Sequence, residues 1–71
     1  MNEHNGQNIK NELYEIREAI LKSGGDPAKQ LSGYILSEDP IYIPSTDGAR
    51  SKIRKLERDD ILTELINEYF K

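Results

Sequence analysis

Cysteine is absent from this chain of 71 residues, and histidine occurs once, at His4. Without cysteine, the chain can form neither a disulfide nor a zinc site with thiolate ligands. A cysteine nucleophile is excluded, and no serine or threonine lies near His4 in the polar stretch of residues 1–7. We therefore expect a protein that is not an enzyme and that has no catalytic, cofactor-binding or metal-binding residues.

Long apolar runs are missing as well, since no stretch approaches the roughly 20 residues that a membrane-spanning helix requires. Residues 1–7 lack the basic and apolar regions of a signal peptide. We therefore expect a cytoplasmic protein that does not contact membranes. The net charge of −3 and the isoelectric point of about 5.0 argue against nonspecific binding to nucleic acid.

The chain also has few apolar residues with which to form a core, since only 35% of its 71 residues are hydrophobic. A single core in 71 residues rarely contributes more than about 3–5 kcal/mol of stability. Natural domains of this size gain further stability from disulfides, a metal or a partner subunit. Self-association is the source that remains here, and we predict a homodimer.

Apolar periodicity predicts an all-α fold with a disordered arm over residues 1–7 and one helical domain over residues 8–71. The first helix is expected over residues 9–23, with Asn8 as N-cap and two glycines after its end. The second is expected to begin at Asp26-Pro27 and to end before Pro40. Gly33 in its middle predicts that another backbone approaches closely there.

A connector and two further helices follow in the prediction. Residues 41–43, between two prolines, are expected to be extended, with Ile41 and Ile43 on one side and Tyr42 on the other. The apolar stripe of a third helix, which begins near residue 49, loses its phase at Asp60. We therefore predict a separate fourth helix over about residues 60–70, with a bend at 57–59, and one long bent helix is the alternative. The predicted architecture is a four-helix module with an extended, Pro-flanked connector.

Half of the ten basic residues lie in residues 50–58. One interpretation is a docking face for an acidic or phosphorylated protein, because arginine binds carboxylates and phosphates in bidentate fashion. In the other, the arginines pair with the chain's own Asp39, Asp47, Asp59 and Asp60, and the lysines are solvated. The predicted partner-binding residues are Arg50, Lys52, Arg54, Lys55 and Arg58.

Two other features have competing interpretations. Asp59, Asp60 and Glu64 could hold a divalent ion, but aspartates at the start of a helix favour its dipole, and we interpret them as capping residues. The helix–connector–helix order suggests a DNA-binding helix-turn-helix. The connector, about residues 38–48, is much longer than the turn of that motif, and acidic residues flank the basic stretch.

A run of residue types between Gly25 and Tyr69 occurs in one register: Gly25, Asp26-Pro27, Gln30, Gly33-Tyr34, Leu36-Ser37, Asp39-Pro40, Tyr42-Ile43-Pro44, Ala49-Arg50, Ile53-Arg54-Lys55, Glu57-Arg58-Asp59, Glu64-Leu65 and Tyr69. This run resembles the IreB family, small cytoplasmic regulatory phosphoproteins of low-GC Gram-positive bacteria. The resemblance implies a compact helical dimer without known catalytic activity. It also implies a substrate of a membrane Ser/Thr kinase, phosphorylated on threonines of the N-terminal arm, and a negative regulator in the response to cell-wall-active antibiotics.

The sequence departs from that family at two places. No serine or threonine precedes Ser23, and Glu38 stands where the family tends to have glycine. The predicted phosphate acceptors are instead Ser45 and Thr46, in the turn that precedes Arg50.

The predicted function is regulation without catalysis, by binding to another protein. We link it to Ser/Thr kinase signalling in cell-envelope stress or the antibiotic response. The expected partners are a second copy of the chain and an unidentified protein such as the kinase. A nucleic-acid-binding protein of the helix-turn-helix type is the alternative, and a structural subunit without a switch is a third interpretation.

Overall fold

The computed structural model describes residues 6–71, in which four α-helices and two short 3-10 turns follow one another. The elements are α1 (Gly6–Lys22), α2 (Pro27–Ser37), η1 (Pro40–Tyr42), η2 (Thr46–Gly48), α3 (Ala49–Arg54) and α4 (Arg58–Tyr69). The prediction of an all-α fold with four helices is confirmed, and α3 and α4 are separate. Helix α1 begins at Gly6, before the predicted N-cap Asn8, and residues 1–5 of the predicted arm lie outside the described residues.

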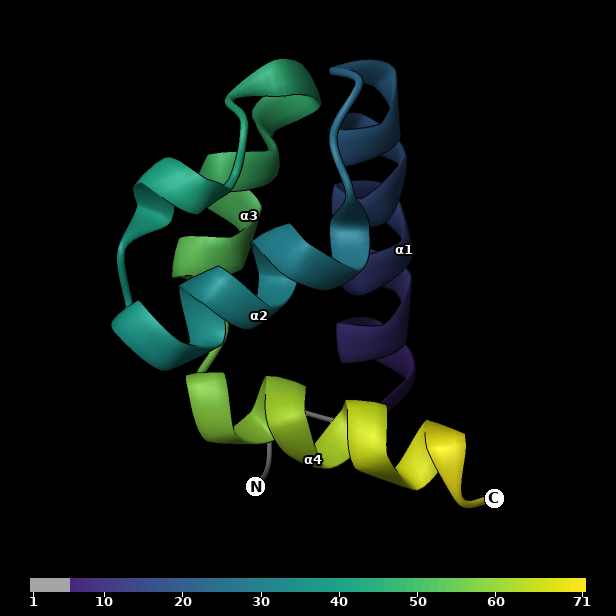
Figure 1. Cartoon of the computed structure of the whole chain (residues 1–71). Helices are drawn as coiled ribbons and strands as arrows, with labels where there is room; N and C mark the ends of the chain where they lie inside the picture. The colour runs from purple at the N-terminus through teal and green to yellow at the C-terminus, as the bar shows by residue number, and fades with distance from the viewer. Residues whose placement is uncertain (1–5) are drawn as a thin grey trace.

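The four helices surround one small core. Helices α1 and α3 run side by side, α2 crosses them, and α4 lies across one end of the molecule (Figure 1). The side chains with almost no exposed surface come from three of these helices and from the connector: Ile16, Ile20, Ile43, Ile53 and Ile61. The connector therefore contributes to the core as well as linking the helices.

Helix α1 ends where the glycine pair predicts. Gly24 takes a left-handed conformation, with φ of 81°, which glycine adopts without steric cost. The Gly25 N–H donates to the Ile20 carbonyl at 2.9 Å, and the Gly24 N–H donates to the Leu21 carbonyl at 3.0 Å. These two bonds satisfy carbonyls that the helix end would otherwise leave without donors.

Asp26 caps the N-terminus of α2, and Glu38 follows its C-terminus. The Asp26 carboxylate accepts from the N–H of Ala28 at 3.1 Å, as expected for an N-cap. At the other end, Glu38 has φ of 62°, the left-handed conformation in which helices usually place glycine. Its carboxylate contacts Arg58 Nε at 2.9 Å. Glu38 thus ends the helix in the conformation that suits glycine, and its N–H donates to the Tyr34 carbonyl at 2.7 Å.

The prediction of an extended connector is wrong. Residues 40–42 form the 3-10 turn η1, in which the Asp39 carboxylate accepts from the Ile41 N–H at 3.1 Å. A proline with its fixed φ and an aspartate before it favour such a turn over a strand. The predicted alternation fails with it, because Ile43 is fully buried whereas Ile41 is 72% exposed.

Gly33 is packed tightly, but against a ring and not against backbone. A Cβ atom at position 33 would lie 2.6 Å from Cδ1 of Tyr42, well inside van der Waals contact. Gln30 Nε2 donates to the Tyr42 carbonyl at 2.9 Å and so holds the connector against α2. The predicted close approach exists, and its partner is the Tyr42 side chain.

The break between α3 and α4 spans residues 55–57 and overlaps the predicted bend at 57–59 only at Glu57, so that α4 begins two residues earlier than predicted. Helix α3 ends at Arg54, and α4 begins at Arg58 after an N-cap at Glu57, whose side chain forms no capping bond. The predicted capping aspartates lie inside the first turn, and Asp59 accepts from the Asp60 N–H at 3.0 Å. There they still favour the helix dipole, although neither is the N-cap residue.

Candidate functional site

Three of the five predicted partner-binding residues form hydrogen bonds or ion pairs with other elements of the chain. Arg50 Nε donates to the Ile43 carbonyl at 2.8 Å. Lys52 Nζ donates to the Asp47 carbonyl at 3.0 Å and lies 3.4 Å from the Glu15 carboxylate. Arg50 thus bonds within the chain, but to a carbonyl and not to one of the predicted acids. Lys52 was expected to be solvated in the interpretation of pairing within the chain, and it pairs instead with Glu15 of α1, which was not among the predicted acids. Helical spacing within residues 50–58 gives no information about a partner so far away in the chain.

Arg58, the third of these bases, connects α4 to the end of α2. It contacts the Glu38 carboxylate through Nε and donates to the Ile35 carbonyl through a second nitrogen. This pairing also was not predicted, because Glu38 becomes available only through the left-handed exit of α2. Arg50, Lys52 and Arg58 thus act as internal ties between elements.

Arg54 and Lys55 have a different environment. Both side chains are exposed at the end of α3, and neither forms a hydrogen bond or ion pair with the part of the chain that the structure describes. An exposed, unpaired arginine next to a lysine can accept a carboxylate or phosphate from another molecule without breaking an internal contact. Of the five predicted partner-binding residues, Arg54 and Lys55 are therefore the two that remain available for a partner.

Helix α4 exposes most of its predicted apolar stripe. Only Ile61 is fully buried, whereas the side chains that we call the apolar face of α4 are between 38% and 82% exposed: Leu62, Leu65, Ile66, Tyr69 and Phe70, which directly follows the helix. Tyr69 and Phe70 pack edge to face, with ring centroids 4.9 Å apart. Contiguous exposed apolar surface of this kind marks interaction sites.

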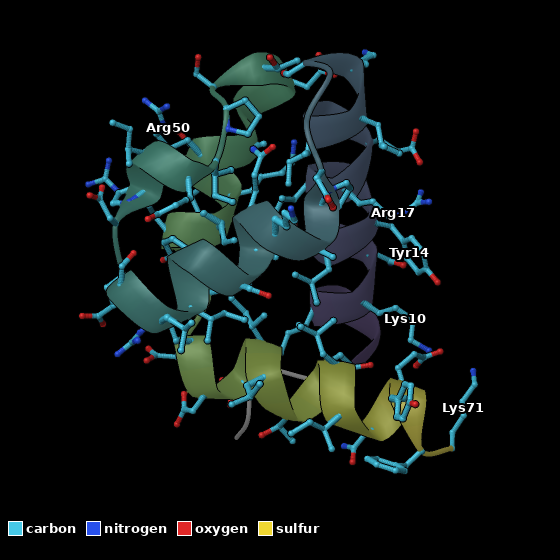
Figure 2. The ribbon with its side chains drawn as sticks, in the orientation of Figure 1. Lys10, Tyr14, Arg17, Arg50 and Lys71 are labelled. Carbon is cyan, nitrogen blue, oxygen red and sulfur yellow. The ribbon has the colours of Figure 1, made fainter. Side chains whose placement is uncertain are left out.

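A groove lies between α1, α2 and α4, next to the apolar face. Figure 2 shows Lys10, Tyr14 and Arg17 along one edge of α1, with Arg50 on the other side of the molecule. The groove has a volume of about 160 Å³ and is lined by Lys10, Leu13, Tyr14, Arg17, Leu31, Glu64, Leu65 and Glu68. This volume suits an apolar side chain and is below the roughly 300 Å³ at which small-molecule pockets begin.

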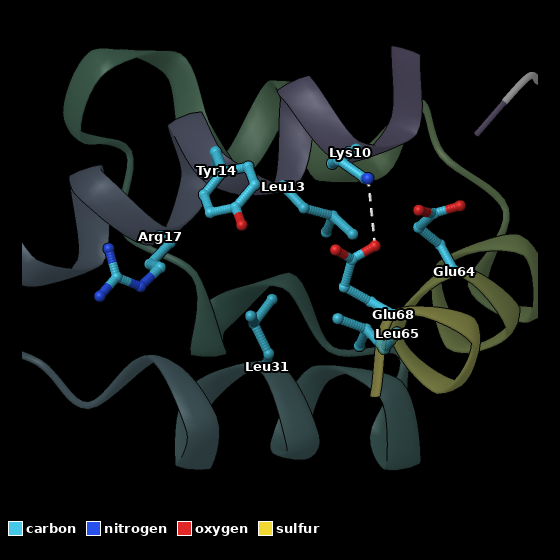
Figure 3. Close-up of a pocket in the computed structure, with 8 residues that line it drawn as sticks. All are labelled: Lys10, Leu13, Tyr14, Arg17, Leu31, Glu64, Leu65 and Glu68. Carbon is cyan, nitrogen blue, oxygen red and sulfur yellow. Dashed lines mark ion pairs between the residues drawn. The ribbon is translucent and has the colours of Figure 1, made fainter. Parts of the chain in front are cut away.

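The rim of this groove is charged, with bases on α1 and acids on α4. Lys10 Nζ and the Glu68 carboxylate meet across it at 3.1 Å (Figure 3). The hydrogen bond from Lys71, together with that from Lys10, lowers the pKa of Glu68 below its ordinary value. The ion pair with Lys10 therefore ties α4 to α1 at the open side of the groove.

The predicted phosphate acceptors lie in a loop that α1 and α3 hold from both sides. Lys22 Nζ contacts the Asp47 carboxylate at 2.7 Å, and this hydrogen bond raises the pKa of Lys22 and lowers that of Asp47. The Thr46 hydroxyl lies 3.0 Å from the Ser23 hydroxyl. Ser45, by contrast, is exposed, and its hydroxyl forms no bond with residues 6–71. The two predicted acceptors are thus not equivalent.

Metal binding and membrane spanning both place demands on the described part of the chain. Within residues 6–71, no three His, Cys, Asp or Glu side chains are arranged so as to hold a metal ion, and this includes the Asp59, Asp60 and Glu64 cluster. None of the helices in the same range combines the length and the apolar character needed to cross a bilayer.

The whole sequence was also compared with known families. A family model described as IreB regulatory phosphoprotein matches residues 1–71. The match extends beyond residues 25–69, over which the resemblance is visible in the residue types. It therefore includes α1 and the C-terminal end of α4 as well as the connector and the basic stretch.

Proposed function

Because the chain belongs to the IreB family of regulatory phosphoproteins, we propose that it regulates by binding other proteins and that it does so as a homodimer, without catalysis. Kinase signalling in response to cell-envelope stress or cell-wall-active antibiotics is the setting that the resemblance implies. The observation that carries the proposal is the apolar face of α4, whose side chains residues 6–71 leave between 38% and 82% exposed. The occupant that we propose is a second copy of the chain, because a small core gains stability from a partner subunit.

Sedimentation equilibrium at tens of micromolar tests the homodimer. The chain should sediment with about twice its mass of 8.2 kDa. Ile66→Glu places a charge on the apolar face, where Ile66 is 48% exposed, and should give a folded monomer. Asn67→Glu is the matched control, because Asn67 is the next exposed residue of α4 and lies outside that face. A monomeric wild-type protein throughout that range would contradict the proposal.

Arg54 and Lys55 support a second contact, with an acidic or phosphorylated protein. An affinity pull-down from the native cell, analysed by mass spectrometry, should recover a partner with the wild-type chain and lose it with the double variant Arg54→Glu, Lys55→Glu. Lys29→Glu is the control, since Lys29 is also exposed and its side chain has no ion pair within residues 6–71. Equal recovery by all three proteins would show that the basic pair is not the docking face.

No observation favours the nucleic-acid-binding alternative. Helix α3, which would have to read a groove, has six residues, and three of the five bases around it are bound within the chain. We expect no complex with duplex DNA tighter than micromolar at physiological salt, because too few free cations remain to release counterions. A fluorescence anisotropy titration checks this, and nanomolar binding to any duplex would favour the alternative.

A further inference from the structure

The sequence contains seven serine and threonine side chains, all of them at or after position 23: Ser23, Ser32, Ser37, Ser45, Thr46, Ser51 and Thr63. Phosphorylation of a serine or threonine in this sequence would therefore modify the folded domain. A protein kinase must bring the acceptor hydroxyl into its active site, so accessible loop residues are favoured over residues held in regular structure. The surroundings of each hydroxyl decide which of the seven a kinase can reach.

Three of the hydroxyls lie on helices. Ser32, Ser51 and Thr63 are exposed but belong to α2, α3 and α4. Their backbones are held in helical hydrogen bonds, so a kinase could bind them in extended form only after local unfolding. Each of these sites therefore carries a free-energy cost that a loop residue does not.

Three other hydroxyls already have partners. Ser23 and Thr46 bond to each other at 3.0 Å, and Ser23 also donates to the Ala19 carbonyl at 3.0 Å. Ser37 donates to the Gly33 carbonyl at 2.7 Å. Phosphorylation at any of them would first have to break a bond that holds a helix end or the loop.

Ser45 is the remaining side chain. It lies between η1 and η2, in residues 43–45, which have no regular secondary structure. Its side chain is exposed, and its hydroxyl forms no hydrogen bond with the described residues. It is the hydroxyl that a kinase can reach without unfolding a helix or breaking a side-chain bond.

Cations hold this loop on both sides of Ser45. Two residues before it, the Ile43 carbonyl accepts from Arg50 Nε at 2.8 Å. Two residues after it, the Asp47 carboxylate lies 2.7 Å from Lys22 Nζ, and the Asp47 carbonyl accepts from Lys52 Nζ at 3.0 Å. A phosphate introduced between these two points would add a charge of about −1.5 to −2 at pH 7 to a loop that three cations already contact and that also contains the Asp47 carboxylate.

We propose that Ser45 is the phosphate acceptor of this chain and that the phosphate binds the cations that flank the loop, which tightens it. This inference rests on the proposed role in Ser/Thr kinase signalling. In the reaction, the Ser45 hydroxyl oxygen attacks the γ-phosphorus of ATP and forms a new P–O bond. The bond between that phosphorus and the β–γ bridging oxygen breaks, ADP leaves, and the hydroxyl proton passes to the kinase. The charged phosphate then forms charge-assisted hydrogen bonds with Arg50 or Lys22.

Site mapping tests the acceptor. The full chain is treated with ATP and the catalytic domain of a membrane Ser/Thr kinase from the same cell, and its phosphopeptides are identified by mass spectrometry. Phosphate at position 45 that is lost in Ser45→Ala and retained in Thr46→Val supports the proposal. Phosphate at another residue only, or none at all, overturns it. With an intact dimer, phosphate at another residue only would contradict this inference and leave the proposed function standing. With an intact dimer and no phosphate at all, the kinase link of the proposed function would fail as well, and the homodimer alone would remain.

Direct incorporation of phosphoserine tests the docking of the phosphate. Phosphoserine at position 45 should raise Tm by about 4–8 °C, the shift expected when a domain of this size gains one such interaction. The rise should largely disappear in 1 M salt, because the cations are partly exposed. Phosphothreonine at position 63, an exposed residue of α4 whose helical neighbours Asp59 and Asp60 are acidic, is the control with the same charge and should not raise Tm. An unchanged or lower Tm for the position-45 protein would overturn the docking.

Discussion

The contact between Gly33 and Tyr42 has no room for a side chain at position 33. We expect Gly33→Leu to lower the free energy of unfolding by about 1–3 kcal/mol, because a Cβ would lie 2.6 Å from Cδ1 of Tyr42. Urea unfolding followed by circular dichroism measures the effect. Ser32→Ala, at the exposed neighbouring position of α2, is the control and should change stability by less than about 0.5 kcal/mol. If Gly33→Leu matched that control, the ring would have to move away at no cost.

Glu38 combines a backbone conformation that suits glycine with an ion pair that needs a carboxylate. Relief of the left-handed strain is worth about 1–2 kcal/mol, whereas a partly exposed ion pair such as that with Arg58 contributes about 0–1 kcal/mol. Glu38→Gly should therefore raise the free energy of unfolding by about 0.5–1 kcal/mol. Glu38→Gln, which keeps the strain and loses the charge, should lower it slightly. Chemical denaturation of both variants checks the order, and a less stable Glu38→Gly would show that the ion pair is the larger effect.

At the scale of the element, the residues that end helices were more predictable than the surfaces that helices pack against. The two glycines after α1 and the cap at Asp26 act locally, so the sequence alone predicts their effect. The prediction of an extended connector fails because a dipeptide of aspartate and proline can begin a turn as well as end a helix. The sequence predicts the apolar stripe of α4. Periodicity does not show which residues of such a stripe are buried in a small core and which stay exposed.

For the candidate site too, features that depend on neighbouring residues could be predicted from the sequence, and contacts with distant residues could not. A cluster of five bases is visible in the sequence, and so is the absence of serine and threonine before Ser23. What separates Arg54 from Arg58 is the distant residue Glu38, whose approach depends on how α2 ends. The spacing of the bases within residues 50–58 does not show which arginine contacts another helix and which one has no hydrogen bond or ion pair with the described residues.

This difference gives a matched pair of variants for the tie between α2 and α4. Arg58→Ala should lower the free energy of unfolding by about 1–3 kcal/mol, because it leaves the half-buried Ile35 carbonyl without its donor and Glu38 without its cation. Arg54→Ala should change it by less than about 0.5 kcal/mol. Thermal and urea unfolding of the two proteins compare them. Equal effects would mean that Arg58 is not a tie.

For the whole molecule, acid should weaken the contacts between distant elements. The hydrogen bonds from Lys22 to Asp47 and from Lys71 and Lys10 to Glu68 lower the pKa of both carboxylates. Their contribution to stability is therefore complete above the unfolded pKa values, near about 4, and is lost as the pH falls through the lower folded values. Tm should be constant from pH 7 to about pH 5 and decrease below about pH 4.

Carboxamide variants assign that acid transition. Asp47→Asn and Glu68→Gln should each flatten the decrease of Tm below pH 4, whereas Glu18→Gln, in an exposed pair between neighbouring residues of α1, should not. A pH series of thermal scans measures the slopes. Unchanged slopes in both carboxamide variants would assign the transition to other acids.

The position of α4 across one end of the fold has a consequence for how the chain opens. The helix is attached to the rest of the domain by one fully buried side chain, Ile61, and by partly exposed ties through Lys10 and Arg58. Because α4 has one fully buried side chain, we expect it to detach at a lower free energy than α1, which has several, so that its amide protons exchange with solvent while α1 remains closed. Whatever covers the apolar face of α4 must then also protect these amides, and the extent of that protection depends on protein concentration if the cover is a second copy.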